Sequence, residues 1–135
     1  MNKYNLRRIV TSDYDVFDTW WIKNGYPHNP EFEYLPDNGL GGFVIEKDKQ
    51  IAVAYIYHTN SSIAYIDFLI ANPEYKNKDR FELITILIDK CVQTAIKEGA
   101  TCVWAMTNSN GIIKRCQELG YHTSKKDNCL ITYQF

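Results

Sequence analysis

The sequence has no long apolar run, no block of like charge, no linker rich in glycine or serine and no internal repeat. The first absence argues against a secretory signal and a membrane span, and the others argue against disorder and a solenoid. The net charge of −1 lacks the basic excess of most proteins that bind nucleic acid. We therefore expect a single globular domain over residues 1–135 that binds neither nucleic acid nor a membrane.

The sequence also lacks a close pair of cysteines. Cys91, Cys102, Cys116 and Cys129 are far apart, whereas zinc sites usually place two ligands within a few residues of each other. Each cysteine lies in an apolar pattern, as a small buried hydrophobic residue would. We expect no metal site, four buried thiols and a reducing compartment, which is the cytoplasm.

The first helix is expected close to the N-terminus. Residues 4–10 are typical of a strand, and Ser12 with Asp15 three residues later forms an acidic variant of the capping box. The helix is expected to run to about Asn24, where Gly25 can adopt the left-handed conformation that ends many helices.

Aromatic residues gather in this helix and in the segment after it. Trp20 and Trp21 would point about 100° apart on a helix, so one of them could line a pocket or a partner surface. Residues 25–42 hold three of the four prolines and several glycines, which indicates a long loop of the kind that often binds ligands. The two tryptophans and loop 25–42 are the candidate surface for a protein partner, because aromatic anchors dominate interfaces.

The middle of the chain is typical of an antiparallel meander. Residues 42–46 and 50–58 are strand-like and are joined by the short turn at residues 47–49. A second turn at residues 60–62 leads to a third strand over residues 63–71.

The second half alternates helices and strands. Apolar residues recur at helical spacing over residues 83–96, and a short apolar strand is expected at 101–106. A helix capped by Asn108 and a last strand over residues 129–135 follow. The order β-α-β-β-β-α-β-α-β predicts an α/β (α+β) fold with a mixed, mostly antiparallel central sheet flanked by helices.

Two segments resemble the GNAT superfamily of acyl-coenzyme A-dependent N-acyltransferases. Residues 68–79, Phe-Leu-Ile-Ala-Asn-Pro-Glu-Tyr-Lys-Asn-Lys-Asp, are similar to the family's strand, Val-x-Pro and basic-glycine loop. Residues 117–121, Gln-Glu-Leu-Gly-Tyr, are similar to its Leu-Gly-Phe ending. The element order matches over nearly the whole chain. The resemblance implies transfer of an acetyl group from acetyl-CoA to an amine of a small molecule or a protein.

In this family the helix after the loop holds the pyrophosphate of coenzyme A with its free backbone N–H groups and its dipole. The strand before the loop hydrogen-bonds the pantetheine arm. The resemblance therefore implies these cofactor-binding residues: Leu69, Ile70, Ala71, Lys76, Asn77, Lys78, Asp79, Arg80, Phe81 and Asn108.

The loop departs from the family pattern. The family's basic-Gly-x-Gly-x-Gly/Ala falls on residues 76–81, Lys-Asn-Lys-Asp-Arg-Phe, so none of the small positions is kept. Two outcomes stay open. Asp79 with Glu82 three residues later can form a capping box and occupy the N–H groups that a pyrophosphate needs. Alternatively, Lys76, Lys78 and Arg80 can hold the phosphates with their side chains.

The resemblance also implies candidate catalytic residues. Asp67 is the only carboxylate on the strand before the loop and is the candidate base, with a purely structural carboxylate as the alternative. The family's acidic position lies nearer Tyr65, which is also a candidate catalytic residue. The family's tyrosine acid falls on Cys116, and the alternative proton donors are Tyr121, Tyr57 and Tyr55, which the sequence does not rank.

A second hypothesis is a binding protein that has kept the fold and lost the cofactor. The small size and altered loop also resemble acetyltransferase-like proteins encoded by tailed bacteriophages. Such a protein would act on a host target or belong to the particle.

Overall fold

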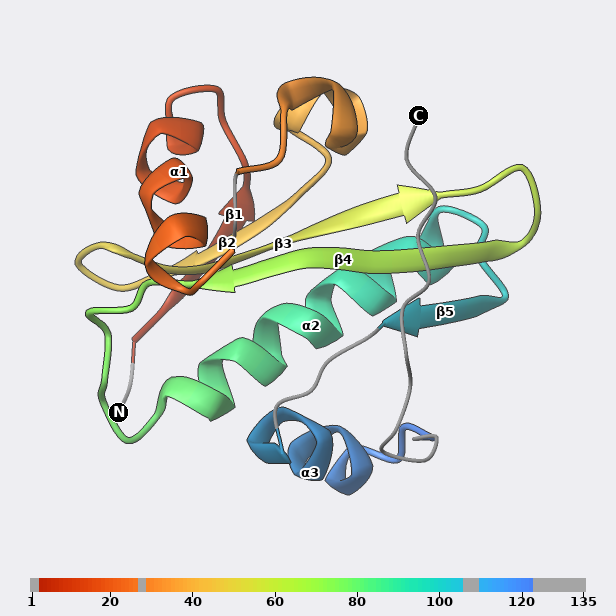
Figure 1. Ribbon diagram of the computed structural model, residues 1–135. Coiled ribbons are helices and arrows are strands. Elements are labelled where there is room, and N and C mark those ends of the chain that lie inside the picture. Colours follow the sequence, from red (N-terminus) through yellow and green to blue (C-terminus); the bar gives the residue numbers. More distant parts are fainter. Residues whose placement is uncertain (1–2, 27–28, 106–109, 123–135) are drawn as a thin grey trace.

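The computed structural model describes residues 3–26, 29–105 and 110–122. Strands, helices and two short 3-10 helices alternate along the chain (Figure 1). Their bounds are β1 Asn5–Arg8, α1 Asp13–Lys23, η1 Phe32–Tyr34, η2 Pro36–Gly39, β2 Gly42–Glu46, β3 Gln50–His58, β4 Ile63–Ala71, α2 Arg80–Lys97, β5 Cys102–Ala105 and α3 Asn110–Glu118. The strand predicted at residues 129–135 and Asn108 lie outside the described residues.

Within the described residues the sheet has five strands in the order β1-β2-β3-β4-β5. The first four strands pair antiparallel, and β5 pairs parallel to β4. The chain reaches β5 through α2, because a parallel neighbour cannot be joined by a tight turn. The mixed, mostly antiparallel sheet predicted from the sequence is confirmed.

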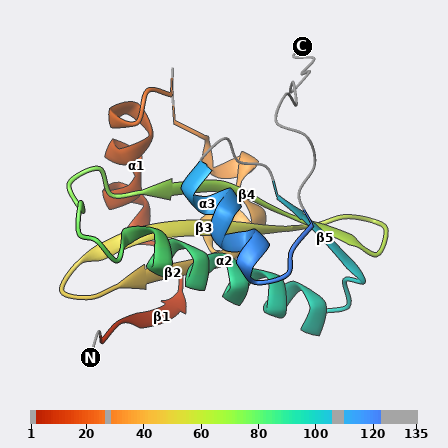
Figure 2. The same ribbon diagram turned by 90° about the horizontal axis from the view of Figure 1, so that it is seen from below.

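Helices cover both faces of the sheet. In Figure 1, α1 and the two 3-10 helices lie above the strands, whereas α2 and α3 lie below them. Figure 2 shows the underside, where α2 runs across the strands with α3 beside it. Among the described residues, none of the helices has the length and apolar content that a bilayer crossing requires.

Alternate strand residues build two separate cores. One core joins the sheet to α2, whose apolar stripe is buried from Leu83 to Ala95. The other joins the sheet to α1 and contains Val44, Val53 and Tyr55. Of the cysteines, Cys91 is buried as predicted, but Cys116 is only partly buried and Cys102 is exposed. Cys102 was predicted to be buried and is not, because it begins β5 at the edge of the described sheet.

The two tryptophans of α1 both belong to the core. Trp20 is 4% exposed and Trp21 is 0% exposed. Trp20 packs on Phe17, with ring centroids 5.1 Å apart, and Trp21 lies 6.4 Å from Tyr14. The predicted partner surface through Trp20 and Trp21 is therefore wrong. The physical reason is that both indoles pack into the core between α1 and the sheet, with Leu35 of the following segment in the same core, which leaves neither indole at the surface.

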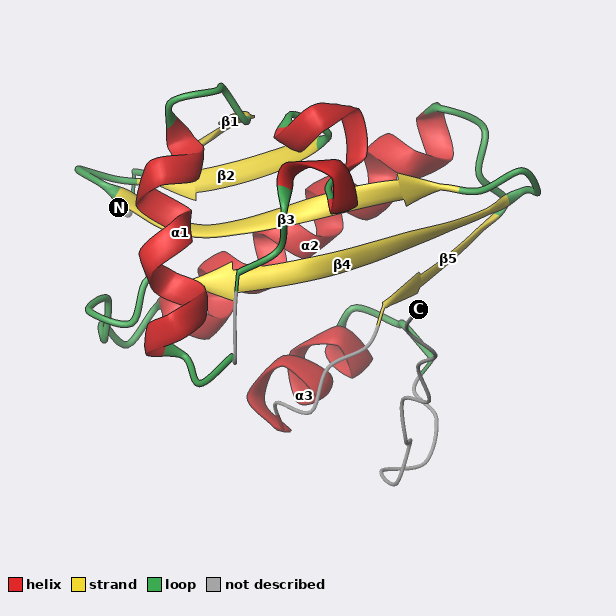
Figure 3. Cartoon of the chain, turned by 45° about the horizontal axis from the view of Figure 1, so that its top comes forward, coloured by secondary structure: helices red, strands yellow, loops and turns green. Residues whose placement is uncertain are grey.

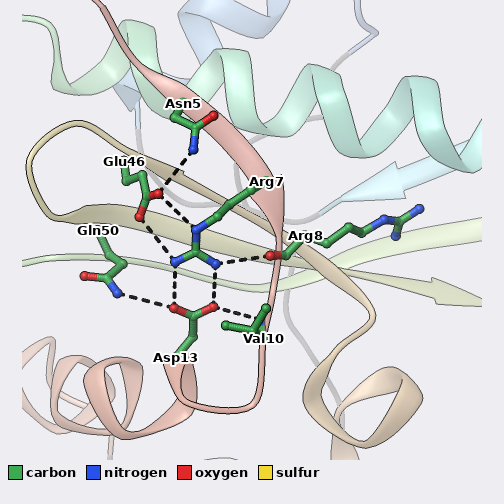
Figure 4. A network of polar contacts seen from close by, with 7 residues as sticks. All are labelled: Asn5, Arg7, Arg8, Val10, Asp13, Glu46 and Gln50. Carbon is green, nitrogen blue, oxygen red and sulfur yellow. Dashed lines mark hydrogen bonds and ion pairs between the residues drawn. The ribbon is translucent and has the colours of Figure 1, made fainter.

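A charged network fixes the start of α1 to the sheet (Figure 4). Asp13 is 2% exposed and accepts two hydrogen bonds of 2.8 Å from the Arg7 guanidinium of β1. It also accepts from the backbone N–H of Val10 at 2.8 Å and from Gln50 at 3.3 Å. Arg7 in turn donates to Glu46 at the end of β2.

This network replaces the capping box expected at Ser12 and Asp15. Ser12 has helical backbone angles and makes no side-chain cap, whereas a capping serine needs an extended backbone. Asp13 satisfies the Val10 N–H instead. The capping prediction at this helix is wrong, because a charged partner on β1 pulls the neighbouring carboxylate into the structural role.

Candidate active site

Among the described residues, the pairing of β4 with β5 covers only the first half of β4. It runs from Ile63 opposite Cys102 to Ile66 opposite Ala105. β4 itself continues to Ala71. Figure 3 shows the two strands diverging from their shared start. Among the described residues, Leu69, Ile70 and Ala71 therefore have no partner strand on the β5 side. An extended ligand such as the pantetheine arm could pair with this side of Leu69 and Ile70, whereas the Ala71 carbonyl already accepts a hydrogen bond of 3.2 Å from the Asn24 side chain.

A bulge interrupts β4 where the divergence begins. Val53 pairs with Ile70 and Tyr55 pairs with Asp67, so one residue of β3 opposes both Phe68 and Leu69. Phe68 has φ 49°, a left-handed conformation that is uncommon for a residue other than glycine. The Asp67 carboxylate accepts a hydrogen bond of 2.7 Å from the Phe68 N–H. The side chain of Asp67 is exposed, so the bulge holds a carboxylate at the open end of the strand.

The α1 face around Asp67 is rich in aromatic side chains. Tyr65 lies two residues before Asp67 and makes an edge-to-face contact with Trp104, with ring centroids 5.5 Å apart. On β3, Tyr57 is the sheet partner of Tyr65. The pKa of Tyr57 is raised by burial first and by the negative charge of Asp67 second. Asp67, Tyr65 and Tyr57 are therefore brought together on one face.

Cys116 and Tyr121 lie on the other face of the sheet. Both pack against the core formed by α2. The Tyr121 hydroxyl donates to the Asp89 carboxylate of α2. Burial raises the pKa of both groups, and the neighbouring Asp89 raises that of Tyr121 further. The structure therefore does not bring these two candidate donors to Asp67.

The start of α2 does not have the predicted capping box. Asp79 occupies the N-cap position, but its side chain makes no cap hydrogen bond and its backbone is not extended. One carboxylate oxygen accepts from the Tyr75 hydroxyl at 2.7 Å, and the other accepts from the Lys47 ammonium in the β2–β3 turn. The bond from Lys47 and then that from Tyr75 lower the pKa of Asp79. A charged donor outcompetes neutral amides, so the capping prediction for Asp79 and Glu82 is wrong.

The basic residues of the loop surround this helix start. Lys76, Asn77 and Lys78 are exposed, and Arg80 reaches back to the Tyr75 carbonyl at 3.3 Å. The ring of Phe81 instead lies against Gly111 of α3, where an added Cβ would meet it at 3.0 Å. Phe81 thus faces the start of α3. The exposed side chains of Lys76 and Lys78 are the positive charges that the loop can present to a ligand.

The donors at this end of α2 fit a diphosphate group. α2 is 18 residues long and lacks a side-chain cap. The Arg80 N–H donates to the Asn77 carbonyl at 3.1 Å, so the N–H groups of Phe81 and Glu82 are the first-turn donors that lie at the positive end of the helix dipole. Lys76 and Lys78 add positive charge, and Lys47 neutralises Asp79. Within the part of the chain that the structure describes, no group of three His, Cys, Asp or Glu side chains converges as metal ligands would.

Sequence reasoning did not rank Tyr57 and missed Trp104 and Lys47. On β3, Tyr55 pairs with Asp67 and Tyr57 pairs with Tyr65. The spacing of two residues between the two tyrosines was visible in the sequence and indicated that they share a face. Lys47 gave no signal, since it lies 32 residues from its partner Asp79.

The chain resembles known proteins in structure and not detectably in sequence. No family model matches the sequence, and none of the curated proteins matches it. The solved structures that resemble it are acetyltransferases or related synthases. The ribosomal-protein alanine N-acetyltransferase of Escherichia coli has a TM-score of 0.72 and 16% identity, covering 91% of this chain and 80% of that enzyme. Glucosamine-6-phosphate N-acetyltransferase of Arabidopsis thaliana has a TM-score of 0.66 and 14% identity, covering 98% and 99%.

A third structure contains the cofactor. N-acetylglutamate synthase of Neisseria gonorrhoeae, complexed with coenzyme A and N-acetyl-glutamate, has a TM-score of 0.70 and 16% identity. The match covers 96% of this chain but only 30% of the synthase. Identities this low establish architecture and leave chemistry open. With its mixed sheet, its diverging β4 and β5 and these structural relatives, the chain has the fold of the GNAT acetyltransferases.

Proposed function

We propose that the protein is an N-acetyltransferase that uses acetyl-CoA to acetylate an amine of a small molecule or a protein. The observation that carries this proposal is the uncapped start of α2 together with the end of β4, which among the described residues has no partner strand on its β5 side. The two features offer donors for a diphosphate and backbone groups for an extended arm. When bound, acetyl-CoA supplies an activated thioester.

Binding of the cofactor is assigned to two groups of residues. Backbone groups of Leu69, Ile70 and Ala71 hold the extended arm. The first-turn amides of α2, together with residues 76–80, hold the phosphates. Asp79 has a supporting role: while Lys47 and Tyr75 bind its carboxylate, it leaves the amides free. Phe81 forms a wall toward α3.

We assign general acid–base catalysis to residues on the face of the sheet that packs against α1. Asp67 is the proposed base, because its carboxylate is exposed and a hydrogen bond from the Phe68 N–H orients it. Tyr65, exposed on the same strand face, is the proposed proton donor that works with it. Cys116 and Tyr121 stay protonated at neutral pH, because burial raises the pKa of each, and they are proposed as donors on the α3 side.

Calorimetry with acetyl-CoA and an assay of thiol release against a panel of amines test the proposal. We expect acetyl-CoA to bind and at least one amine to release coenzyme A, with Asp67→Asn reducing transfer and leaving binding intact. Absence of binding to a folded protein would refute the proposal. It would favour the alternative of a cofactor-free binding protein, whose partner would have to use a surface other than Trp20 and Trp21.

A further inference from the structure

The side chain of Asn24 joins the end of α1 to the end of β4. Its amide nitrogen donates to the Trp20 carbonyl of α1 at 2.7 Å and to the Ala71 carbonyl of β4 at 3.2 Å. Figure 1 and Figure 3 place the last turn of α1 beside the arrowhead of β4. The first bond is short and the second is at the long end of the usual range, so the bond to Ala71 is the weaker of the two.

The end of α1 does not need this side chain as a cap. The Trp20 carbonyl also accepts from the backbone N–H of Asn24 at 2.9 Å. Gly25 has φ 90°, the left-handed conformation of a Schellman motif. Its N–H donates to the Ile22 carbonyl at 3.0 Å, and the following N–H donates to the Trp21 carbonyl at 3.0 Å. Backbone bonds therefore close the helix, and the bond from this side chain to β4 calls for another explanation.

The Ala71 carbonyl faces the side of β4 on which β5 diverges. Ala71 lies opposite Ala52 of β3, and the N–H of Asn72 donates to the Ile51 carbonyl at 2.7 Å. In an antiparallel ladder these bonds, one residue beyond the pair, turn the N–H and C=O of Ala71 away from β3. Among the described residues, no strand pairs with this side of Ala71. Asn24 therefore occupies an acceptor that an extended ligand along β4 would need.

The two partners of this bond differ in their need for it. Asn24 is exposed, so its amide can bond water instead at little cost. Ala71 is 8% exposed, and a buried carbonyl without a donor destabilises a folded chain. An incoming N–H group can therefore take over the carbonyl while Asn24 turns to water, which keeps every group satisfied.

We propose that Asn24 is a placeholder for the cofactor: its side chain holds the Ala71 carbonyl in the free protein and is displaced by an amide N–H of the extended arm of acetyl-CoA. This inference rests on the proposed function, because it concerns how the same site admits its cofactor. Asn24 thereby lowers the affinity for the cofactor, and the end of α1 is released from β4 when the site is filled.

Calorimetry on the full chain compares the wild-type protein with Asn24→Ala. The probes are coenzyme A, whose arm carries amide N–H groups, and adenosine 3′,5′-bisphosphate, which lacks the arm. The dissociation constant of coenzyme A should fall about three- to tenfold in the variant, as expected for one hydrogen bond that no longer has to be broken. That of adenosine 3′,5′-bisphosphate should not change. Asn60→Ala, which changes an exposed asparagine in the β3–β4 turn, is the matched control and should alter neither constant.

The stability of Asn24→Ala separates this role from a purely structural one. The unfolding midpoint of the free variant in urea should fall, because the Ala71 carbonyl loses its donor. With coenzyme A at saturation, the midpoint should return to that of the wild-type protein, because the arm then supplies the donor in both proteins. A purely structural contact would lower the midpoint with and without the ligand and would not improve binding.

NMR follows the displacement directly in the wild-type protein. The side-chain NH2 resonances of Asn24, assigned by their absence from Asn24→Ala, should shift on addition of coenzyme A and exchange faster with water. Adenosine 3′,5′-bisphosphate should leave them in place. If Asn24→Ala does not fold, the same resonances are assigned from through-bond connectivities, and this measurement decides alone.

Equal or weaker binding of coenzyme A by a folded Asn24→Ala, or Asn24 resonances that coenzyme A does not move, would overturn the inference and leave the proposed function intact. Absence of coenzyme A binding to both folded proteins would refute the proposed function and this inference with it. Displacement of Asn24 without acetyl transfer to any amine would refute the enzyme proposal alone.

Discussion

Removing Arg7 should destabilise the protein more than removing Asp13, although both changes break the same ion pair. Asp13 is 2% exposed and Arg7 is 28% exposed. Arg7→Ala would leave a buried carboxylate without its cation, which typically costs about 3–5 kcal/mol. Asp13→Ala would leave an arginine that still reaches water and Glu46, so its cost should be about 2 kcal/mol, the range of one hydrogen bond to a charged group.

Urea unfolding measures this asymmetry. In thermal unfolding, each kcal/mol lost from the free energy of unfolding should lower the melting temperature by roughly 4 °C in a domain of this size. The double variant should lose less than the sum of the two single variants, because the second change removes a group already left without its partner. Equal losses, a larger loss for Asp13→Ala, or additive effects would refute the inference that burial of Asp13 decides the energetics.

The pH dependence of stability provides a second test of the Arg7–Asp13 pair. Burial opposes ionisation of Asp13, but the bonds from Arg7, Val10 and Gln50 outweigh it, so the pKa of Asp13 lies below its ordinary 3.8. The stability from this group is therefore complete above about pH 4 and is lost as the pH falls through the lowered folded value. In Arg7→Ala, burial remains without the cation, so the pKa should rise above the ordinary value. The variant should then gain stability on acidification where the wild-type protein loses it.

Three further outcomes are expected at the candidate active site. Lys47→Ala should weaken acetyl-CoA binding in calorimetry, because the released Asp79 carboxylate turns to the amides of α2, and adding Asp79→Gly should restore it. Asp67→Asn should lower acetyl transfer about 10²- to 10⁴-fold, the usual contribution of a general base, with binding unchanged. Tyr57→Phe should loosen the segment around Tyr34, whose carbonyl loses its donor, and so speed limited proteolysis there.

Each of these three predictions has an outcome that would contradict it. Acetyl-CoA binding that is indifferent to Lys47→Ala would show that Asp79 does not compete for the helix start. Full activity in Asp67→Asn would remove it as the base. Unchanged cleavage in Tyr57→Phe would show that other contacts hold the segment, and Tyr26→Phe, at an exposed position, controls for the substitution itself.

Local patterns predicted most of the architecture. The meander of β2, β3 and β4 and the apolar stripe of α2 follow from periods of two and 3.6 residues, which are properties of neighbouring residues. The bulge at Phe68 was not predicted, because it depends on how Val53 and Tyr55 register against the facing strand. Asp67 was selected because it is the only carboxylate on the strand before the loop, and its catalytic role stays a prediction.

Long-range electrostatics decided what local rules could not. Ser12 and Asp79 both satisfied the pattern of a helix cap, and neither side chain makes one. In each case an arginine or lysine from another element claims the nearby carboxylate, and a sequence motif contains no information about that partner. The prediction for Trp20 and Trp21 failed for a related reason, since both indoles are buried in the core between α1 and the sheet, and the pattern of a lone helix does not show which face the sheet covers.

The bond between Lys47 and Asp79 also constrains how this loop could have evolved. An aspartate at the head of α2 in a chain without a cation on the β2–β3 hairpin would have blocked its own ligand. The side chains at positions 47 and 79 therefore depend on each other, because the cation at position 47 is what holds the carboxylate at position 79. Transplanting residues 72–82 into another protein of this fold should fail unless the hairpin travels with them.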